Sequence, residues 1–238
     1  MKPAFYSFLL LGVIFINFGC KNKSTDPALK PAHVTLVPGG GDTTAVETGI
    51  DAVPEGNLIH LEWTQVENAS VVAFSVFRKA EREKEFAKLV TIEAPVRFYD
   101  DPVPFLDVRY YYFVRAVSDE GLESEPSDTL SYKLIQKAES MTPEGKTDAK
   151  PMFRWRDLYH ANDYVIRVQE SLSESVTWIS RFQKPQYGPD EQYVQYNADG
   201  RARLDSLVKG RAYEWRIDVL GNEASCGSES RWVPIQIQ

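Results

Sequence analysis

The sequence has few of the residues that build metal centres or covalent frameworks. Among its 238 residues are only two cysteines, three histidines and three methionines. Two cysteines exclude a disulfide scaffold, and the histidines at positions 33, 60 and 160 are too scattered to complete a zinc cluster with them. We therefore expect neither a metal nor a cofactor.

Positive charge and catalytic motifs are also scarce. Lys and Arg total 27 against 34 Asp and Glu, a formal net charge of −7. Phosphate binding needs a basic surface, so no nucleic-acid partner is expected. The chain has no Gly-x-Ser-x-Gly elbow, no phosphate-cradling glycine loop and no His-Glu-x-x-His pair. These gaps favour a protein that is not an enzyme and has no catalytic residues.

Two acidic pairs, Asp100–Asp101 and Asp119–Glu120, come nearest to a cation site. A calcium loop needs six to eight oxygens at a fixed spacing, and neither pair supplies them. We interpret both pairs as turn-forming residues.

No apolar run is long enough to span a bilayer. The mostly apolar stretch from Ala4 to Phe18 falls short of the ~18–20 residues required. It ends at Asn17-Phe18-Gly19-Cys20, after which the chain turns polar. A small residue before a cysteine that closes such a stretch resembles the signal of bacterial lipoproteins. In that family the signal peptidase cuts before the cysteine, which becomes the lipidated N-terminus.

The lipoprotein resemblance implies a signal peptide over residues 1–19, lipidation at Cys20 and a flexible tether over residues 20–30. Asn17 departs from the Leu, Val or Ile that the family prefers at that place. Lys21 stands where the family puts an Asp in proteins kept at the inner membrane, so the resemblance implies a bacterial cell-envelope protein anchored in outer-membrane lipid. The alternative is an ordinary secretory signal in which Cys20 is incidental.

Aromatic and apolar residues are plentiful in the rest of the chain. Hydrophobic residues make up 43% of the sequence, including 12 Tyr, 12 Phe and 5 Trp. In both halves they alternate with polar residues, which is typical of strands with one buried face. Examples are Ile59, Leu61 and Trp63 in the first half and Tyr213, Trp215 and Ile217 in the second. The pattern predicts an all-β fold of two tandem antiparallel β-sandwiches, over residues 31–137 and 138–238.

Four segments of the first half resemble a fibronectin type III domain. They are Leu61-Glu62-Trp63, Phe74-Ser75-Val76-Phe77-Arg78, the Tyr-rich run from Tyr110 to Val117, and Gly121-Leu122-Glu123-Ser124-Glu125-Pro126-Ser127. The family places these on strand B, strand C, strand F and the F–G connection. The second half resembles the family more faintly. This immunoglobulin-like sandwich serves many roles, so the resemblance implies a fold and no particular activity.

Each half also carries the sign of a tyrosine corner, in which a Tyr hydroxyl bonds upstream backbone and fixes the crossover between sheets. In the second half this is Leu207-x-x-Gly210-x-x-Tyr213. In the first half Tyr110 takes the place of Tyr213, but Asp107 replaces the glycine. We therefore expect a looser corner at Tyr110.

Three aromatic side chains of the first half are out of phase with its core. Phe77, Tyr111 and Phe113, here called the aromatic patch, are predicted to share the outer face of one sheet. We expect the long segment 39–56, or the neighbouring domain, to cover the patch; an external protein or glycan is the alternative. The equivalent face of the second half carries Val165, Arg167, Gln169, Glu214, Arg216 and Asp218, which predicts a solvated surface.

These features favour a non-enzymatic, lipid-anchored envelope protein that acts as a binding or spacer module. The alternative is a carbohydrate-binding accessory lipoprotein that uses outward aromatic residues such as Trp232 or Tyr111. Cys226, unpaired once Cys20 is lipidated, is expected to be buried and inert.

Overall fold

The computed structural model describes residues 30–65, 71–103, 105–159, 161, 163–183 and 190–238. Every regular element in these ranges is a β-strand, which confirms the predicted all-β fold. The first half contains β1 (Val34–Leu36), β2 (Asp51–Ala52), β3 (Leu58–Gln65), β4 (Val71–Ala80), β5 (Ala87–Glu93), β6 (Phe98–Pro102), β7 (Arg109–Ser118) and β8 (Leu130–Leu134).

These strands form the first sandwich. One sheet places β1, β2 and β6 around β3, and the other has the order β5-β4-β7-β8. The strand alternation decides which side chains face inward: Tyr110, Tyr112, Val114 and Ala116 on β7 are buried, and their neighbours are partly exposed. Trp63 lies on β3 and the segment 121–127 connects β7 to β8, an arrangement that fits a fibronectin type III sandwich.

The second half contains β9 (Glu139–Thr142), β10 (Gly145–Thr147), β11 (Met152–Arg156), β12 (Asp163–Glu170), β13 (Ser175–Gln183), β14 (Glu191–Gln195), β15 (Ala212–Leu220), β16 (Cys226–Glu229) and β17 (Val233–Ile237). Its smaller sheet has the order β14-β11-β9. In the facing sheet β15 pairs with β12, β16 and β17, while β13 lies beyond β12. Trp155, Trp178 and Trp215 are fully buried between the two sheets.

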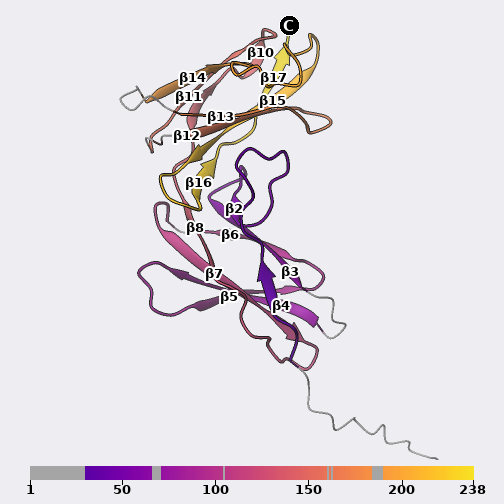
Figure 1. Cartoon of the computed structure of the whole chain (residues 1–238), viewed down its shortest axis with the longest axis vertical. Coiled ribbons are helices and arrows are strands. Elements are labelled where there is room, and N and C mark those ends of the chain that lie inside the picture. Colours follow the sequence, from indigo (N-terminus) through magenta and orange to yellow (C-terminus); the bar gives the residue numbers. More distant parts are fainter. Residues whose placement is uncertain (1–29, 66–70, 104, 160, 162, 184–189) are drawn as a thin grey trace, which may run out of the picture.

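The two sandwiches lie end to end along the long axis of the molecule (Figure 1). The sheet β5-β4-β7-β8 of the first sandwich joins the larger sheet of the second, because β16 pairs in parallel with β8. The Lys133 N–H donates to the Ser225 carbonyl at 3.0 Å and the Ile135 N–H to the Gly227 carbonyl at 3.2 Å. A hydrogen-bonded sheet therefore runs across the junction of the two domains.

The predicted turn at Asp100–Asp101 is wrong, because both residues lie inside β6. Asp101 is fully buried and accepts two hydrogen bonds from Arg78, at 3.0 and 2.8 Å, and one from the Tyr112 hydroxyl at 2.7 Å. Burial and this carboxylate raise the pKa of Tyr112 well above its usual value. Partners on two other strands thus allow a charged residue to occupy a strand interior.

The two tyrosine corners have the same geometry. The Tyr213 hydroxyl accepts a hydrogen bond from the Val208 N–H at 3.2 Å, and the Tyr110 hydroxyl is bonded by the Phe105 backbone. Asp107 takes a φ of 59°, the left-handed region also used by Gly210 at 82°. Aspartate tolerates this conformation better than most residues. Asp107 therefore adopts the left-handed backbone conformation that glycine takes in the second corner.

Candidate functional site

Residues 39–56, here called the crossing segment, extend from the first sandwich, where Asp51–Ala52 form β2, and the part that contains Asp42, Thr44 and Glu47 lies against the second sandwich (Figure 1). The base of the segment is closed by hydrogen bonds from the Gly40 N–H to the Thr48 carbonyl at 2.9 Å and from the Ile50 N–H to the Val37 carbonyl at 3.0 Å. Gly49 has a φ of +80°, and a Cβ there would lie 2.1 Å from the Pro38 carbonyl oxygen. Only glycine fits this return point.

Backbone carbonyls of the crossing segment accept hydrogen bonds from an arginine of β12. The Arg167 guanidinium donates to the Thr44 carbonyl at 2.6 Å and to the Asp42 carbonyl at 2.7 Å. The Asp42 carboxylate pairs in turn with Arg181 of β13 at 3.1 Å. The sequence offered one sign of this contact, which was a segment far longer than a sandwich turn requires.

The centre of the contact is an ion cluster formed by Arg167, Arg216, Asp218, Glu229 and Glu47. Arg167 and Arg216 are directly opposed on β12 and β15, an arrangement of like charges that is unfavourable alone. Asp218 bridges them, at 2.7 Å from Arg167 Nε and 2.8 Å from Arg216 Nε.

Glu47 binds the same two arginines from the other domain. Its carboxylate lies 2.8 Å from Arg167 Nη2 and also pairs with Arg216. Glu229 of β16 contacts Arg216 Nη1 at 2.8 Å. The relative exposures of Arg167, Arg216 and Asp218 are 5%, 2% and 6%. The predicted solvated surface at these residues, and at the fully buried Val165, is therefore wrong.

Carboxylates outnumber guanidinium groups in the cluster, and the environment favours proton uptake. Burial raises the pKa of Asp51, beside the cluster, from 3.8 to about 6. Burial, with the neighbouring Asp218, also raises the pKa of Glu229 well above its usual range. Burial lowers the pKa of Arg216, but the carboxylates outweigh that effect and raise it overall. The cluster therefore holds its arginines charged and its excess carboxyl groups ready to bind protons.

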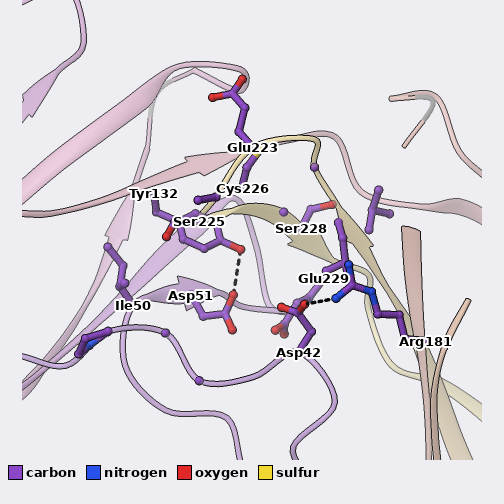
Figure 2. Close-up of a pocket in the computed structure, with 18 residues that line it drawn as sticks. Asp42, Ile50, Asp51, Tyr132, Arg181, Glu223, Ser225, Cys226, Ser228 and Glu229 are labelled. Carbon is purple, nitrogen blue, oxygen red and sulfur yellow. Dashed lines mark hydrogen bonds and ion pairs between the residues drawn. The ribbon is translucent and has the colours of Figure 1, made fainter. Parts of the chain in front are cut away.

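A cavity of about 380 Å³ lies between the domains beside this cluster. Figure 2 shows Asp51, Tyr132, Asp42, Arg181 and Glu229 around it, with the Tyr132 hydroxyl 2.9 Å from Asp51 Oδ1. Carboxylate oxygens of Glu47, Asp51 and Glu229 lie within 4.8 Å of one another, a spacing that a divalent cation can bridge. Two of the three are already bound by Arg216, whose positive charge repels a cation. These carboxylates are therefore better suited to ion pairs with arginine than to binding a metal ion.

A second set of contacts holds the opposite side of the junction. Glu223 accepts hydrogen bonds from Arg109 and from Lys133, each at 3.1 Å. Arg109 also donates to the Ala224 carbonyl at 2.9 Å, and the Ser228 hydroxyl donates to the Gln136 carbonyl at 2.9 Å. The two domains are thus tied by backbone pairing, by surface ion pairs and by the buried cluster.

The aromatic patch lies on β4 and β7, on the outer face of the sheet β5-β4-β7-β8, as the alternation predicted. Phe77 and Phe113 stack with centroids 4.6 Å apart, and all three side chains of the patch are partly exposed. The crossing segment was predicted to cover the patch, and it lies against β12 and β15 instead. Trp232 is partly buried, with the Arg216 guanidinium 4.9 Å from its ring centroid.

The structure describes only one of the two cysteines. Cys20, the predicted lipidation site, lies outside the described residues, as do the predicted signal peptide and most of the tether. Cys226 is a buried free thiol at the start of β16, and burial raises its pKa. Within the described ranges no helix has the length and hydrophobicity that a membrane crossing requires.

The residues of the ion cluster were not predicted as a site. Arg167, Arg216 and Asp218 were assigned to solvent because they are charged and out of phase with the core. The usable signal was their arrangement, in which two arginines on neighbouring strands flank a single aspartate. Such a group needs an additional carboxylate, and Glu47 in the crossing segment supplies it.

Comparison with known proteins finds similar structures but no matching sequence family. No protein-family profile and no curated protein sequence matches the chain. The chain is similar to the crystal structure of the chicken CNTN1 FN1–FN3 domains, with 15% identity and a TM-score of 0.40 over 88% of this chain and 69% of that one. It is also similar to pectate lyase PelI from Erwinia chrysanthemi, with 17% identity and a TM-score of 0.31 over 42% of this chain and 27% of the enzyme.

Proposed function

We propose that this protein is a lipid-anchored, non-enzymatic component of the bacterial cell envelope that acts as a rigid spacer and presents binding faces on its two sandwiches. The observation that carries the proposal is the contact of Glu47, a partly exposed side chain of the first domain, with the buried Arg167 and Arg216 of the second, because it fixes one domain against the other. Tandem domains joined only by a linker would move independently.

The lipid anchor rests on the lipobox-like residues that end in Cys20. Acyl chains on that cysteine would contribute ~0.8 kcal/mol for each buried methylene group. The short polar tether would then hold the first sandwich near the membrane, and the fixed junction would project the second sandwich away from it. Four buried charged groups form ion pairs with one another, which supports a structural role for them. They are Arg167, Arg216, Asp218 and Glu229.

Carbohydrate binding is the weaker candidate. Sugar rings stack on open aromatic faces, but Phe77 and Phe113 stack on each other and Arg216 occupies a face of Trp232. These contacts take one face of each of the three rings, which reduces the area open to a sugar.

Two measurements test the proposal. Intact mass of the membrane-extracted protein should correspond to a chain that begins at Cys20 with added acyl groups, and Cys20→Ala should abolish that mass and release the protein from the membrane. An unmodified soluble wild-type chain would refute the anchor.

The spacer is tested by small-angle X-ray scattering of wild type and Glu47→Arg. We expect the reversed charge to separate the domains and broaden the distance distribution, because it faces Arg167 and Arg216. Glu174→Arg, an exposed residue of the second sandwich, is the matched control and should leave the scattering unchanged. Identical curves for Glu47→Arg and wild type would refute the role of Glu47 in fixing the junction.

A further inference from the structure

The face that carries the aromatic patch is also the basic face of an acidic domain. Five cations lie on this face: Lys79, Lys88, Arg109, Arg115 and Lys133. They are half of the ten Lys and Arg in residues 31–137, which also contain eighteen Asp and Glu. Positive charge is therefore concentrated on one side of a domain that is otherwise negative.

Three of these cations have no carboxylate closer than 3.8 Å, although Arg115 also donates to the Ser124 carbonyl at 3.0 Å. Arg109 and Lys133 are held by Glu223 at the domain junction. Lys88 and Arg115 share a single carboxylate, Glu123, at 3.8 Å. Among the described residues no carboxylate lies within ion-pair distance of Lys79, whose ammonium lies over aromatic rings, 5.0 Å from the Phe86 centroid and 5.7 Å from that of Tyr111.

The aromatic rings strengthen the preference for negative charge. Phe77 and Phe113 are nearly parallel, with 13° between their planes, so each ring covers one face of the other. Phe86 packs edge-on against Phe113, with centroids 4.8 Å apart. The rim of an aromatic ring carries partial positive charge, whereas its face is negative. This face therefore attracts carboxylate groups through its cations and ring edges, and it can also contact apolar side chains through its rings.

We propose that this face binds an acidic, extended segment of a partner protein. Carboxylates of the segment would pair with Lys79, Lys88 and Arg115, and its apolar side chains would contact the edges of Phe77 and Phe113. The segment would lie beside β5, the outermost strand of this sheet among the described residues. Extended chains commonly bind along exposed sheet edges in this way.

A protein segment suits the face better than a membrane or a glycan. An anionic bilayer presents charge over a wide area, and the eighteen acidic residues of the domain would oppose it. A glycan needs open ring faces, and Phe77 and Phe113 use theirs on each other. A short acidic segment meets only the local cations.

The test is the affinity of the full chain for a fluorescein-labelled peptide of about twelve alternating glutamate and valine residues, measured by anisotropy. We expect saturable binding that weakens with added salt. Lys79→Glu combined with Arg115→Glu should weaken binding about tenfold or more. Lys146→Glu with Lys150→Glu, the same charge change at exposed positions of the second sandwich, should leave affinity unchanged.

Three outcomes would overturn the inference. They are no binding to wild type, equal affinity of wild type and the Lys79–Arg115 double variant, or tighter binding of polygalacturonate or phosphatidylglycerol vesicles through the same two residues. The inference rests on the binding role proposed above. Scattering of the same double variant separates the two, because an unchanged interdomain distance leaves the spacer proposal intact when peptide binding fails.

Discussion

Equivalent faces of the two sandwiches have opposite surroundings. In the first sandwich Phe77 on β4 pairs with Phe113 on β7, and this aromatic face is partly exposed. In the second, Arg167 on β12 pairs with Arg216 on β15, and this charged face is buried under the crossing segment. The more apolar face is open and the more polar face is covered, the reverse of what side-chain polarity predicts.

The comparison teaches that burial follows the available partner more than polarity alone. Removing charges from water costs several kcal/mol for each ion unless opposite charges and hydrogen bonds compensate. Asp218, Glu229 and Glu47 compensate the two arginines of the second sandwich. On the first sandwich the rings shield one another, and Lys79 and Arg115 lie over their faces.

The largest expected effect is the loss of a buried arginine. Arg216→Ala leaves the buried carboxyl groups of Asp218 and Glu229 with too little positive charge nearby, so we expect the free energy of unfolding to fall by about 3–5 kcal/mol. Chemical denaturation measures this. Arg211→Ala, which removes an exposed pair with Glu170, is the matched control and should barely move the midpoint. Similar midpoints for the two variants would contradict the importance of the covered face.

The next largest effect is a pH dependence of the free energy of unfolding that is caused by the titration of Asp51. Its pKa is raised from 3.8 to about 6, so the folded state binds the proton more tightly than the unfolded state. Stability from this group is present below about pH 4 and is lost as the pH rises to about 6, by up to about 3 kcal/mol.

Asp51→Asn isolates that effect, because the amide retains an acceptor for the Tyr132 hydroxyl without the charge. We expect the stability of this variant relative to wild type to rise between pH 4 and pH 7 in urea denaturation. Titrating groups that do not interact with Asp51 cancel in the difference. A stability difference that is independent of pH would show that Asp51 titrates normally.

A smaller effect is expected at the return point of the crossing segment. Gly49→Ala forces a Cβ to within 2.1 Å of the Pro38 carbonyl, whereas Gly121 has nearly the same φ, +79°, and an open surrounding. We expect Gly49→Ala to cost about 2 kcal/mol more than Gly121→Ala, since only the first adds a backbone clash to the left-handed conformation. Equal midpoints in denaturant would show that the segment relaxes freely.

The smallest effect is expected on the open face. Phe77→Thr keeps a residue that favours strands and removes the stacking on Phe113, so we expect a loss of about 1 kcal/mol. Thermal unfolding against wild type measures this change. A loss as large as that of Arg216→Ala would mean that the aromatic face is covered after all.

Much of the fold could be predicted from the sequence, because strand alternation is local. Ile59, Leu61 and Trp63 identify the inner face of β3, and the outward phase of Phe77, Tyr111 and Phe113 follows from the same rule. The tyrosine corners also follow from local spacing. Their glycine position was misjudged because aspartate at position 107 adopts the glycine-like backbone.

The ion cluster could not be predicted, since it depends on contacts between distant segments. Glu47 and Arg216 are 169 residues apart in the chain, and neither carries a local sign of its partner. Asp101 is similar, because its burial depends on Arg78 and Tyr112 from two other strands. The sequence predicts that charged residues of a strand are exposed, because it does not show which distant segment supplies the opposite charge.

The most direct test of the fixed junction is the distance between one spin label in each sandwich of the otherwise native chain. Glu85→Cys and Leu172→Cys supply exposed label sites, with Cys20 and Cys226 changed to serine. We predict one narrow distance distribution that is the same in low and high salt, because β8 and β16 pair through their backbones across the junction and Arg167, Arg216 and Asp218 are buried. A broad distribution, or one that widens with salt, would contradict a junction held by Glu47 and the two arginines.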